Sequence, residues 1–150
     1  MHKIGFACKL DNPPDEVNLK STRISWFKNV PADEGYAKLY KIIEHNSNAV
    51  LVLVKHVSKL DPSLRMCRIG SDVLPLFTHA QSKEFYQSTL GKEALAILAS
   101  ALNEAGSLAI ANNVRLSFHP GQYTVLNSIN EGTVENAILE VEYHAMLAEM

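Results

Sequence analysis

The chain has 150 residues, of which 47% are hydrophobic and 20% are charged, a composition typical of a folded globular domain and unlike that of a disordered chain. Fourteen lysines and arginines against 16 aspartates and glutamates give a net charge of −2, which excludes a generally basic surface. Any nucleic-acid binding must therefore come from a local site.

Signals for membrane insertion and secretion are absent from the sequence pattern. No uninterrupted apolar run reaches about 18 residues, and residues 1–5 lack the hydrophobic region of a signal peptide. Two cysteines, Cys8 and Cys67, are too few for a disulfide framework, and they lie in apolar stretches where buried thiols are common. These features predict an intracellular, cytoplasmic protein.

Short apolar runs alternate with long amphipathic patterns along the chain. Residues 3–8 predict a buried strand, and a polar, proline-punctuated loop over 10–31 follows. A helix is predicted from Ala32 to Lys59, because Pro31 and acidic residues mark its start and Asp61-Pro62 ends it. The face of this helix expected to be buried comprises Leu39, Ile42, Ile43, Asn46, Val50, Leu53, Val54 and Val57.

The same alternation continues to the end of the chain. A second strand over 64–69 leads into a loop over 71–79, and a helix over 82–105 follows. A third strand over 114–118 precedes a helix from about residue 132 to the end. The apolar faces of these two helices are predicted as Phe85, Leu90, Leu95, Leu98 and Leu102, with Gly106 as the cap, and as Val134, Ile138, Val141, Ala145 and Ala148.

Strands that alternate with helices favour a parallel sheet. Three βα units in this order are typical of the N-terminal portion of a (β/α)8 TIM barrel, and a complete barrel needs about 250 residues. We therefore interpret residues 1–150 as one incomplete barrel domain. The alternative is a small three-stranded α/β sandwich, and in either case exposed sheet edges favour self-association of this piece.

Two histidines follow neighbouring strands of the predicted sheet. Ligands bind such folds at the carboxyl ends of the strands, where His79 and His119 are expected to project from the same edge. Neutral imidazole is a common metal ligand, and two from adjacent loops can hold one ion. The alternative is that each imidazole caps or packs under its own loop. The histidines expected at surface or core positions are His2, His45, His56 and His144.

A Pro-Gly step after His119 turns the backbone and presents Gln122 and Tyr123. A protruding tyrosine suits stacking on a base, and the neighbouring amide can form two hydrogen bonds at once. The alternative is that Tyr123 packs into the mouth of the barrel. Phe6, at the end of the first strand, opens onto the same rim, with a core position as its alternative.

Two groups of cations are candidates for phosphate contact. Arg65 and Arg68 lie on the second apolar strand, where an arginine is costly unless it is paired or faces a polar site, so Arg68 is expected to meet a phosphate or a carboxylate. The loop over 10–31 mixes an aromatic ring with positive charges, which suits either a nucleic-acid backbone or a plain solvated loop. Its residues in question are Trp26, Lys20, Arg23 and Lys28.

Several segments together resemble the ultraviolet damage endonucleases. They are residues 4–8, the run from Arg68 to His79, the run from Leu116 to Tyr123, and the helical segment over 136–147. The resemblance extends along essentially the whole chain, in order and at suitable spacing, and the block from His119 to Tyr123 is its most specific part. Members of this family are (β/α)8 barrels related to endonuclease IV, with a cluster of divalent metals at the top face.

The resemblance implies a metal-dependent DNA repair endonuclease. Family members nick UV-damaged double-stranded DNA on the 5′ side of pyrimidine dimers and (6-4) photoproducts, and manganese is the expected metal. By this similarity His79 and His119 match metal ligands. Gln122 and Tyr123 match the residues that probe the duplex and fill the gap left by the lesion.

The sequence departs from the family pattern in two ways. Phe6 stands where some members carry a tyrosine, which leaves stacking but no hydroxyl. The family's remaining metal ligands come from later strands, so this 150-residue piece is predicted to be catalytically silent on its own. The alternatives are an abasic-site endonuclease or a sugar isomerase or epimerase on the same barrel type, and a non-catalytic, self-associating half-barrel.

Overall fold

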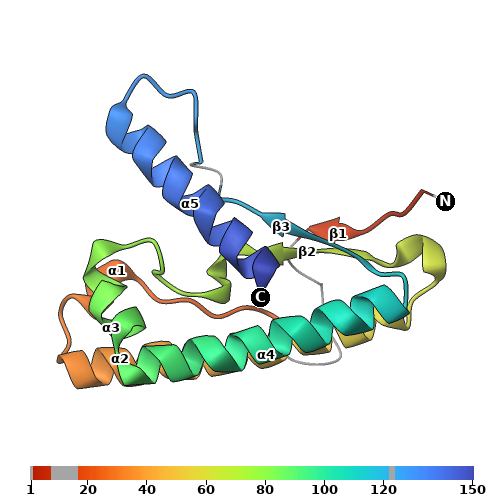
Figure 1. The fold of residues 1–150 in the computed structure, drawn as a ribbon, viewed down its shortest axis with the longest axis horizontal. Coiled ribbons are helices and arrows are strands. Elements are labelled where there is room, and N and C mark those ends of the chain that lie inside the picture. The colour runs from red at the N-terminus through yellow and green to blue at the C-terminus, as the bar shows by residue number, and fades with distance from the viewer. Residues whose placement is uncertain (1, 8–16, 122–123) are drawn as a thin grey trace.

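A computed structural model describes residues 2–7, 17–121 and 124–150 of the chain. Strands and helices alternate as the sequence predicts (Figure 1). The elements are β1 (Phe6–Ala7), α1 (Ile24–Phe27), α2 (Ala32–Ser58), β2 (Met66–Gly70), α3 (Lys83–Gln87), α4 (Thr89–Ala111), β3 (Arg115–His119) and α5 (Glu131–Glu149). Single 3-10 turns lie at Pro62–Leu64, Ser71–Val73 and Ala80–Ser82.

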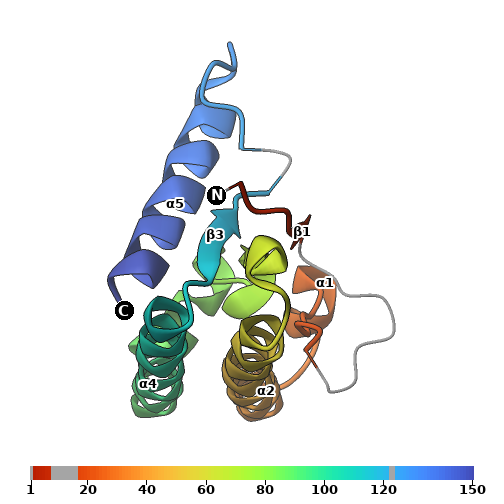
Figure 2. The ribbon, with the colours of Figure 1, turned by 90° about the vertical axis from the view of Figure 1, so that its right-hand side faces the viewer.

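The described strands form one parallel sheet in the order β1-β2-β3. Figure 2 shows α2 and α4 side by side along one face of this sheet, with α5 beside β3. Cys67 and Ile69 of β2 are buried in the core that these helices cover, while the alternate residue Arg68 is half-buried on the opposite face. The parallel register pairs Gly70 with His119, so β2 and β3 end at the same edge.

Helix α2 buries the face that the spacing of its apolar residues predicts. Every one of the eight residues from Leu39 to Val57 expected on that face is buried. Asp33 and Glu34 occupy the first turn, where carboxylates interact favourably with the helix dipole. The sustained period of 3.6 residues thus determines both the helix and its orientation on the sheet.

The predicted helix over 82–105 is broken near its start, and this part of the prediction was wrong. Ser88 has an extended backbone with φ −69° and ψ 164°, and its hydroxyl accepts a hydrogen bond from the Gly91 amide at 3.1 Å. The serine therefore caps a new helix, α4, while residues 83–87 form the separate helix α3. A Cβ at Gly91 would lie 2.0 Å from the carbonyl oxygen of Phe85, so only glycine fits this junction.

Helix α4 also extends beyond Gly106, which lies inside it and is not its cap. The helix continues to Ala111, and Asn113 makes the turn into β3 with a positive φ of 53°. By length and composition α4 is apolar enough to cross a membrane, although Lys92, Glu93 and Glu104 interrupt its apolar residues. Its apolar residues include Leu98 and Leu102, which are buried in the core with α2.

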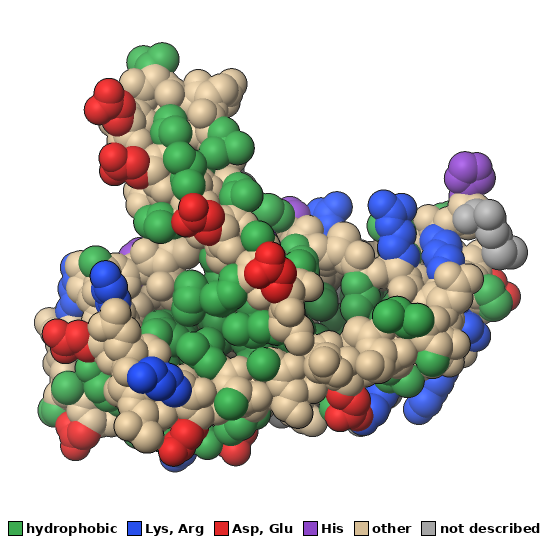
Figure 3. All heavy atoms as spheres, viewed as in Figure 1, with side chains coloured by type: hydrophobic (Ala, Val, Ile, Leu, Met, Phe, Trp, Pro, Cys, Tyr) green, Lys and Arg blue, Asp and Glu red, His purple; other side chains and the backbone are tan. Residues whose placement is uncertain are grey.

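Helix α5 does not bury the face that its aliphatic residues predict. Ile138 and Val141 are 44% and 43% exposed, whereas the buried residues of α5 are Ala137, Tyr143, His144 and Leu147. Tyr143 finds its hydrogen-bond partners in the loop after β2, whereas His144 bonds to Glu140 of its own helix and contacts the Phe118 ring of β3. Figure 3 shows hydrophobic side chains gathered in a hollow beside α5. A cavity of about 480 Å³ lies between α5 and the loop that follows β2, and Phe77, Leu139 and Met146 line part of it.

Candidate functional site

The loop that follows β2 is fixed by hydrogen bonds from buried side chains. The Tyr143 hydroxyl donates to the Ser71 carbonyl at 2.9 Å and accepts from the Leu74 amide at 3.0 Å. Burial raises the pKa of the Tyr143 phenol, which keeps the hydroxyl proton available for donation. The hydroxyls of Tyr86 and Ser82 donate to the next carbonyls along the loop, those of Pro75 and Leu76 respectively.

Asn46 of α2 connects this loop to the segment that precedes α1. The side chain is fully buried; its amide nitrogen donates to the carbonyls of Lys20, Asp72 and Val73, at 2.9, 2.8 and 3.2 Å. Its side-chain oxygen accepts from the Lys20 amide at 2.8 Å. One side chain thus holds together two stretches that are about fifty residues apart in the sequence.

A cavity of about 520 Å³ lies between these stretches and α5, and we refer to it as the His79 pocket. Asp72 and His79 line it from the loop after β2, and Glu140 and Tyr143 line it from α5. Residues 21–25 form the remaining wall. The pocket therefore gathers two carboxylates and an imidazole at the end of the sheet where ligands bind α/β folds.

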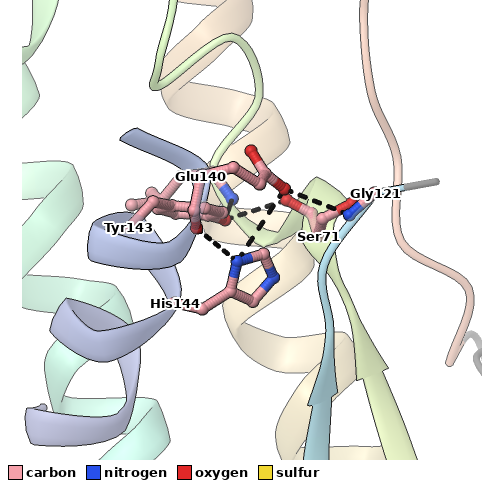
Figure 4. A network of polar contacts seen from close by, with 6 residues as sticks. Ser71, Gly121, Glu140, Tyr143 and His144 are labelled. Atoms are coloured by element: carbon pink, nitrogen blue, oxygen red, sulfur yellow. Dashed lines mark hydrogen bonds and ion pairs between the residues drawn. The ribbon is translucent and has the colours of Figure 1, made fainter. Parts of the chain in front are cut away.

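The turn after β3 is tied to α5 through Glu140. The Gly121 amide donates to Glu140 Oε1 at 3.4 Å, and Figure 4 shows Glu140 reaching from α5 toward both Gly121 and Ser71. His144 lies one turn further along the helix, where its Nδ1 donates to the Glu140 carbonyl at 2.7 Å. Its Nε2 is buried and has no hydrogen-bond partner among the described residues. Glu140 therefore belongs both to the His79 pocket and to the base of the His119–Gly121 turn.

His79 and His119 are both exposed, His119 at the carboxyl end of its strand and His79 beyond the end of the strand before it. His119 is the last residue of β3, and His79 follows β2 by nine residues. Neither imidazole forms a hydrogen bond in the described part of the chain, which is unlike a histidine that caps or packs under its loop. His79 lines the pocket with Asp72 and Glu140, whereas His119 lies outside its lining.

The described residues supply only part of a metal site. Imidazole and carboxylate are the donor types that transition metals such as manganese and zinc accept, so the chemistry of His79, His119 and the neighbouring carboxylates is suitable. Within residues 2–7, 17–121 and 124–150, however, no three histidine, cysteine, aspartate or glutamate side chains are placed to hold one ion. A complete coordination shell thus needs ligands beyond the described ones.

The other predicted contact residues divide into three groups. Gln122 and Tyr123 lie outside the described residues. Phe6 is half-buried and packs against the hydrophobic core, which favours the core position over contact with a substrate. Arg68 pairs with Ser117 in register, on the sheet face opposite α2 and α4, and has no ion pair with a described residue.

Arg65 has a structural role that the sequence left undefined. Its guanidinium donates to the carbonyls of Leu60 and Asn112, at 2.9 Å each, and so joins the ends of α2 and α4 to the start of β2.

Two of the histidines predicted to occupy surface or core positions clearly do so. His2 is exposed, and His144 is buried.

Sequence reasoning missed Glu140, Tyr143 and the role of Asn46. Glu140, Tyr143 and His144 share one side of α5 because they are three and four residues apart, and this spacing was a signal that could have been found. The role of Asn46 had a fainter signal, an amide within an otherwise apolar helix face.

Comparison with known protein families shows which family the chain belongs to. The model of the family described as UV-endonuclease UvdE matches residues 2–150. The chain belongs to the UvdE family. The UV DNA damage endonuclease of Clostridium perfringens is 28% identical over 95% of this chain, and the UV-damage endonuclease of Schizosaccharomyces pombe is 34% identical over 71% of it. The chain spans 30% and 14% of the lengths of these two UvdE relatives.

A solved structure confirms the fold class. The crystal structure of SacUVDE superposes with a TM-score of 0.70 at 24% identity, over 99% of this chain and 45% of that one. The described elements are therefore the N-terminal part of a UvdE TIM barrel, as the order of strands and helices predicts, and not a separate three-stranded sandwich.

Proposed function

We propose that this protein is a DNA repair endonuclease that nicks the backbone of UV-damaged DNA, on the 5′ side of pyrimidine dimers and (6-4) photoproducts, by metal-dependent hydrolysis. Membership of the UvdE family is the observation that carries the proposal. Two features of the chain support it: His79 and His119 stand exposed at one end of a parallel sheet, and carboxylates line the pocket beside His79.

His79 and His119 are proposed as ligands of a divalent metal, with manganese as the expected ion. Bound divalent metals lower the pKa of water and neutralise charge on a phosphate. The chain's own residues contribute two imidazoles, which leaves the described part short of a full coordination shell. We therefore expect residues 1–150 alone to bind metal weakly and to be inactive.

Gln122 and Tyr123 are proposed to enter the duplex at the lesion. A dimer disrupts base stacking, so its extrusion costs less than that of normal bases. An inserted aromatic ring then replaces the lost stacking, with a contribution of about 1–3 kcal/mol. His119 ends β3, and Gly121 immediately precedes this pair in the chain.

The test uses the full-length protein with manganese and a UV-irradiated duplex labelled at one end. We expect nicking 5′ to the photoproducts, a loss of at least 100-fold in His79→Ala and His119→Ala, and little change in the control His2→Ala, which alters an exposed histidine. Preferential cleavage of an abasic duplex, or turnover of a sugar without DNA cleavage, would replace the proposal by the corresponding alternative. Full activity of both variants would remove the proposed ligand role.

A further inference from the structure

A second hollow lies beside the His79 pocket and has a different chemical character. Its volume is about 580 Å³, and it is lined by three hydroxyls, an amide, an indole and two cations. We call it the Arg23–Lys38 hollow. The lining residues are Ser21, Thr22, Arg23, Ser25, Trp26, Asn29 and Lys38. All the polar groups among them can donate hydrogen bonds, and none of the described lining residues carries a carboxylate, which is the composition of an anion site.

The two cations of this hollow have no acidic partner among the residues that the structure describes. Neither Arg23 nor Lys38 forms an ion pair with a carboxylate in the part of the chain that the structure describes. The Lys38 ammonium lies 3.6 Å from the centre of the Trp26 ring, a cation–π contact that fixes its position without neutralising its charge. Both positive charges thus remain available to a ligand.

The segment that carries Arg23 is held in place from both sides. Asn46 binds the amide and the carbonyl of Lys20, three residues before Arg23. The carbonyl of Arg23 accepts a hydrogen bond from the Phe27 amide at 3.1 Å, within the single turn of α1. The cation is therefore presented by a fixed backbone, which lowers the entropy lost on binding.

The hollow and the His79 pocket share one wall. Ser21, Thr22, Arg23 and Ser25 line both cavities, so the segment 21–25 separates a side that holds Asp72, His79 and Glu140 from a side that holds Lys38 and Trp26. One side has the donor groups of a metal site, and the other has unneutralised cations. A polyanion bound in the His79 pocket can therefore continue across segment 21–25 into the Arg23–Lys38 hollow.

We propose that the Arg23–Lys38 hollow binds the phosphodiester backbone of the DNA strand next to the position that occupies the His79 pocket. This inference rests on the proposed function and adds a contact away from the reacting phosphate. The guanidinium of Arg23 binds a phosphate with two parallel hydrogen bonds, and the Lys38 ammonium supplies a second positive charge. Lys28, which the sequence groups with Arg23, does not line the hollow.

The experiment compares two double variants of the full-length protein that change net charge equally. Arg23→Gln/Lys38→Gln removes the cations of the hollow, and Lys59→Gln/Lys92→Gln removes two exposed lysines elsewhere, one directly after α2 and one on α4. Affinity for an irradiated duplex is measured by fluorescence anisotropy across a salt series. We expect the first variant to bind at least tenfold more weakly and to lower the salt slope by about 1.8, because each phosphate contact contributes about 0.9.

A second measurement locates the contact on the DNA. Neutral methylphosphonate linkages, placed one at a time around the lesion, should weaken wild-type binding at one or two positions, and the Arg23→Gln/Lys38→Gln variant should be insensitive at those positions. Two results would overturn this inference and leave the proposed function intact. In the first, both double variants lose the same affinity for the irradiated duplex. In the second, neither variant loses affinity while the wild type binds and nicks normally. A wild type that neither binds nor nicks irradiated DNA would overturn both.

Discussion

The Gly121 amide donates a hydrogen bond to the Glu140 carboxylate across 3.4 Å, which joins the turn after β3 to the middle of α5. Gly121 immediately precedes Gln122 and Tyr123 in the chain. Glu140 also lines the His79 pocket, so one carboxylate contacts both the turn and the cavity. The turn that precedes the residues proposed to enter the duplex is thus attached to α5 through Glu140.

Loss of the Glu140 carboxylate should impair the turn. We expect Glu140→Ala to lower the free energy of unfolding by about 1 kcal/mol, because the Gly121 amide loses its acceptor. Glu140→Gln retains an acceptor oxygen and should restore most of this loss. If the turn positions Tyr123, Glu140→Ala should also reduce the preference for irradiated over intact DNA several-fold, measured by anisotropy. Glu135→Ala, an exposed carboxylate on the same helix, is the control.

Removal of the Asn46 side chain should be among the most damaging single substitutions in the chain. Asn46→Ala leaves the Lys20 amide and three carbonyls without their buried partner, and each such group costs about 1–3 kcal/mol. We expect a loss of at least about 3 kcal/mol in urea unfolding. Asn48→Ala alters an exposed amide on the same helix and should change stability little. Equal effects of the two substitutions would contradict the bridging role.

Alkaline pH should destabilise the fold through Cys67. Burial raises the pKa of the Cys67 thiol from 9.0 to about 12, so the folded state keeps a proton that the unfolded chain releases. The resulting stabilisation is complete below pH 9 and is lost as pH rises from 9 toward 12, by at most about 1.4 kcal/mol per pH unit. Urea unfolding between pH 8 and pH 10.5 measures this slope. Cys67→Ala should make it shallower, and an unchanged slope would contradict the assignment.

The sequence determines the fold most clearly where one periodicity runs through a whole element. In α2 the apolar spacing persists from Leu39 to Val57, and the predicted buried face is the observed one. In α5 the aliphatic residues suggested another face, because Tyr143 acquires its hydrogen-bond partners only when the loop after β2 folds against the helix. The helix break at Ser88 was missed because a serine within a helical pattern is equally compatible with an interior position and with a helix cap.

The sequence predicted where the candidate site lies, but it did not predict the hydrogen-bond network that shapes the site. The sequence predicted that His79 and His119 follow consecutive strands, and the structure has His119 at the end of β3 and His79 nine residues after β2. The hydrogen bonds that shape the pocket depend on tertiary contacts, as when Asn46 reaches Lys20 and Asp72 at once. Such contacts join residues about 26 positions apart, and no local pattern encodes them.

Leu76 occupies the left-handed region of backbone space, with φ 61°, within the loop that leads to His79. This conformation costs a leucine about 1–2 kcal/mol, and the Ser82 hydroxyl on its carbonyl helps to retain it. Since folding itself imposes this shape, an ion or phosphate at the proposed His79 site would meet a preorganised loop and would not need to order it. Relaxation of that segment, for instance by substitution of Ser82, would then reduce affinity at His79 without altering any group that touches the ligand.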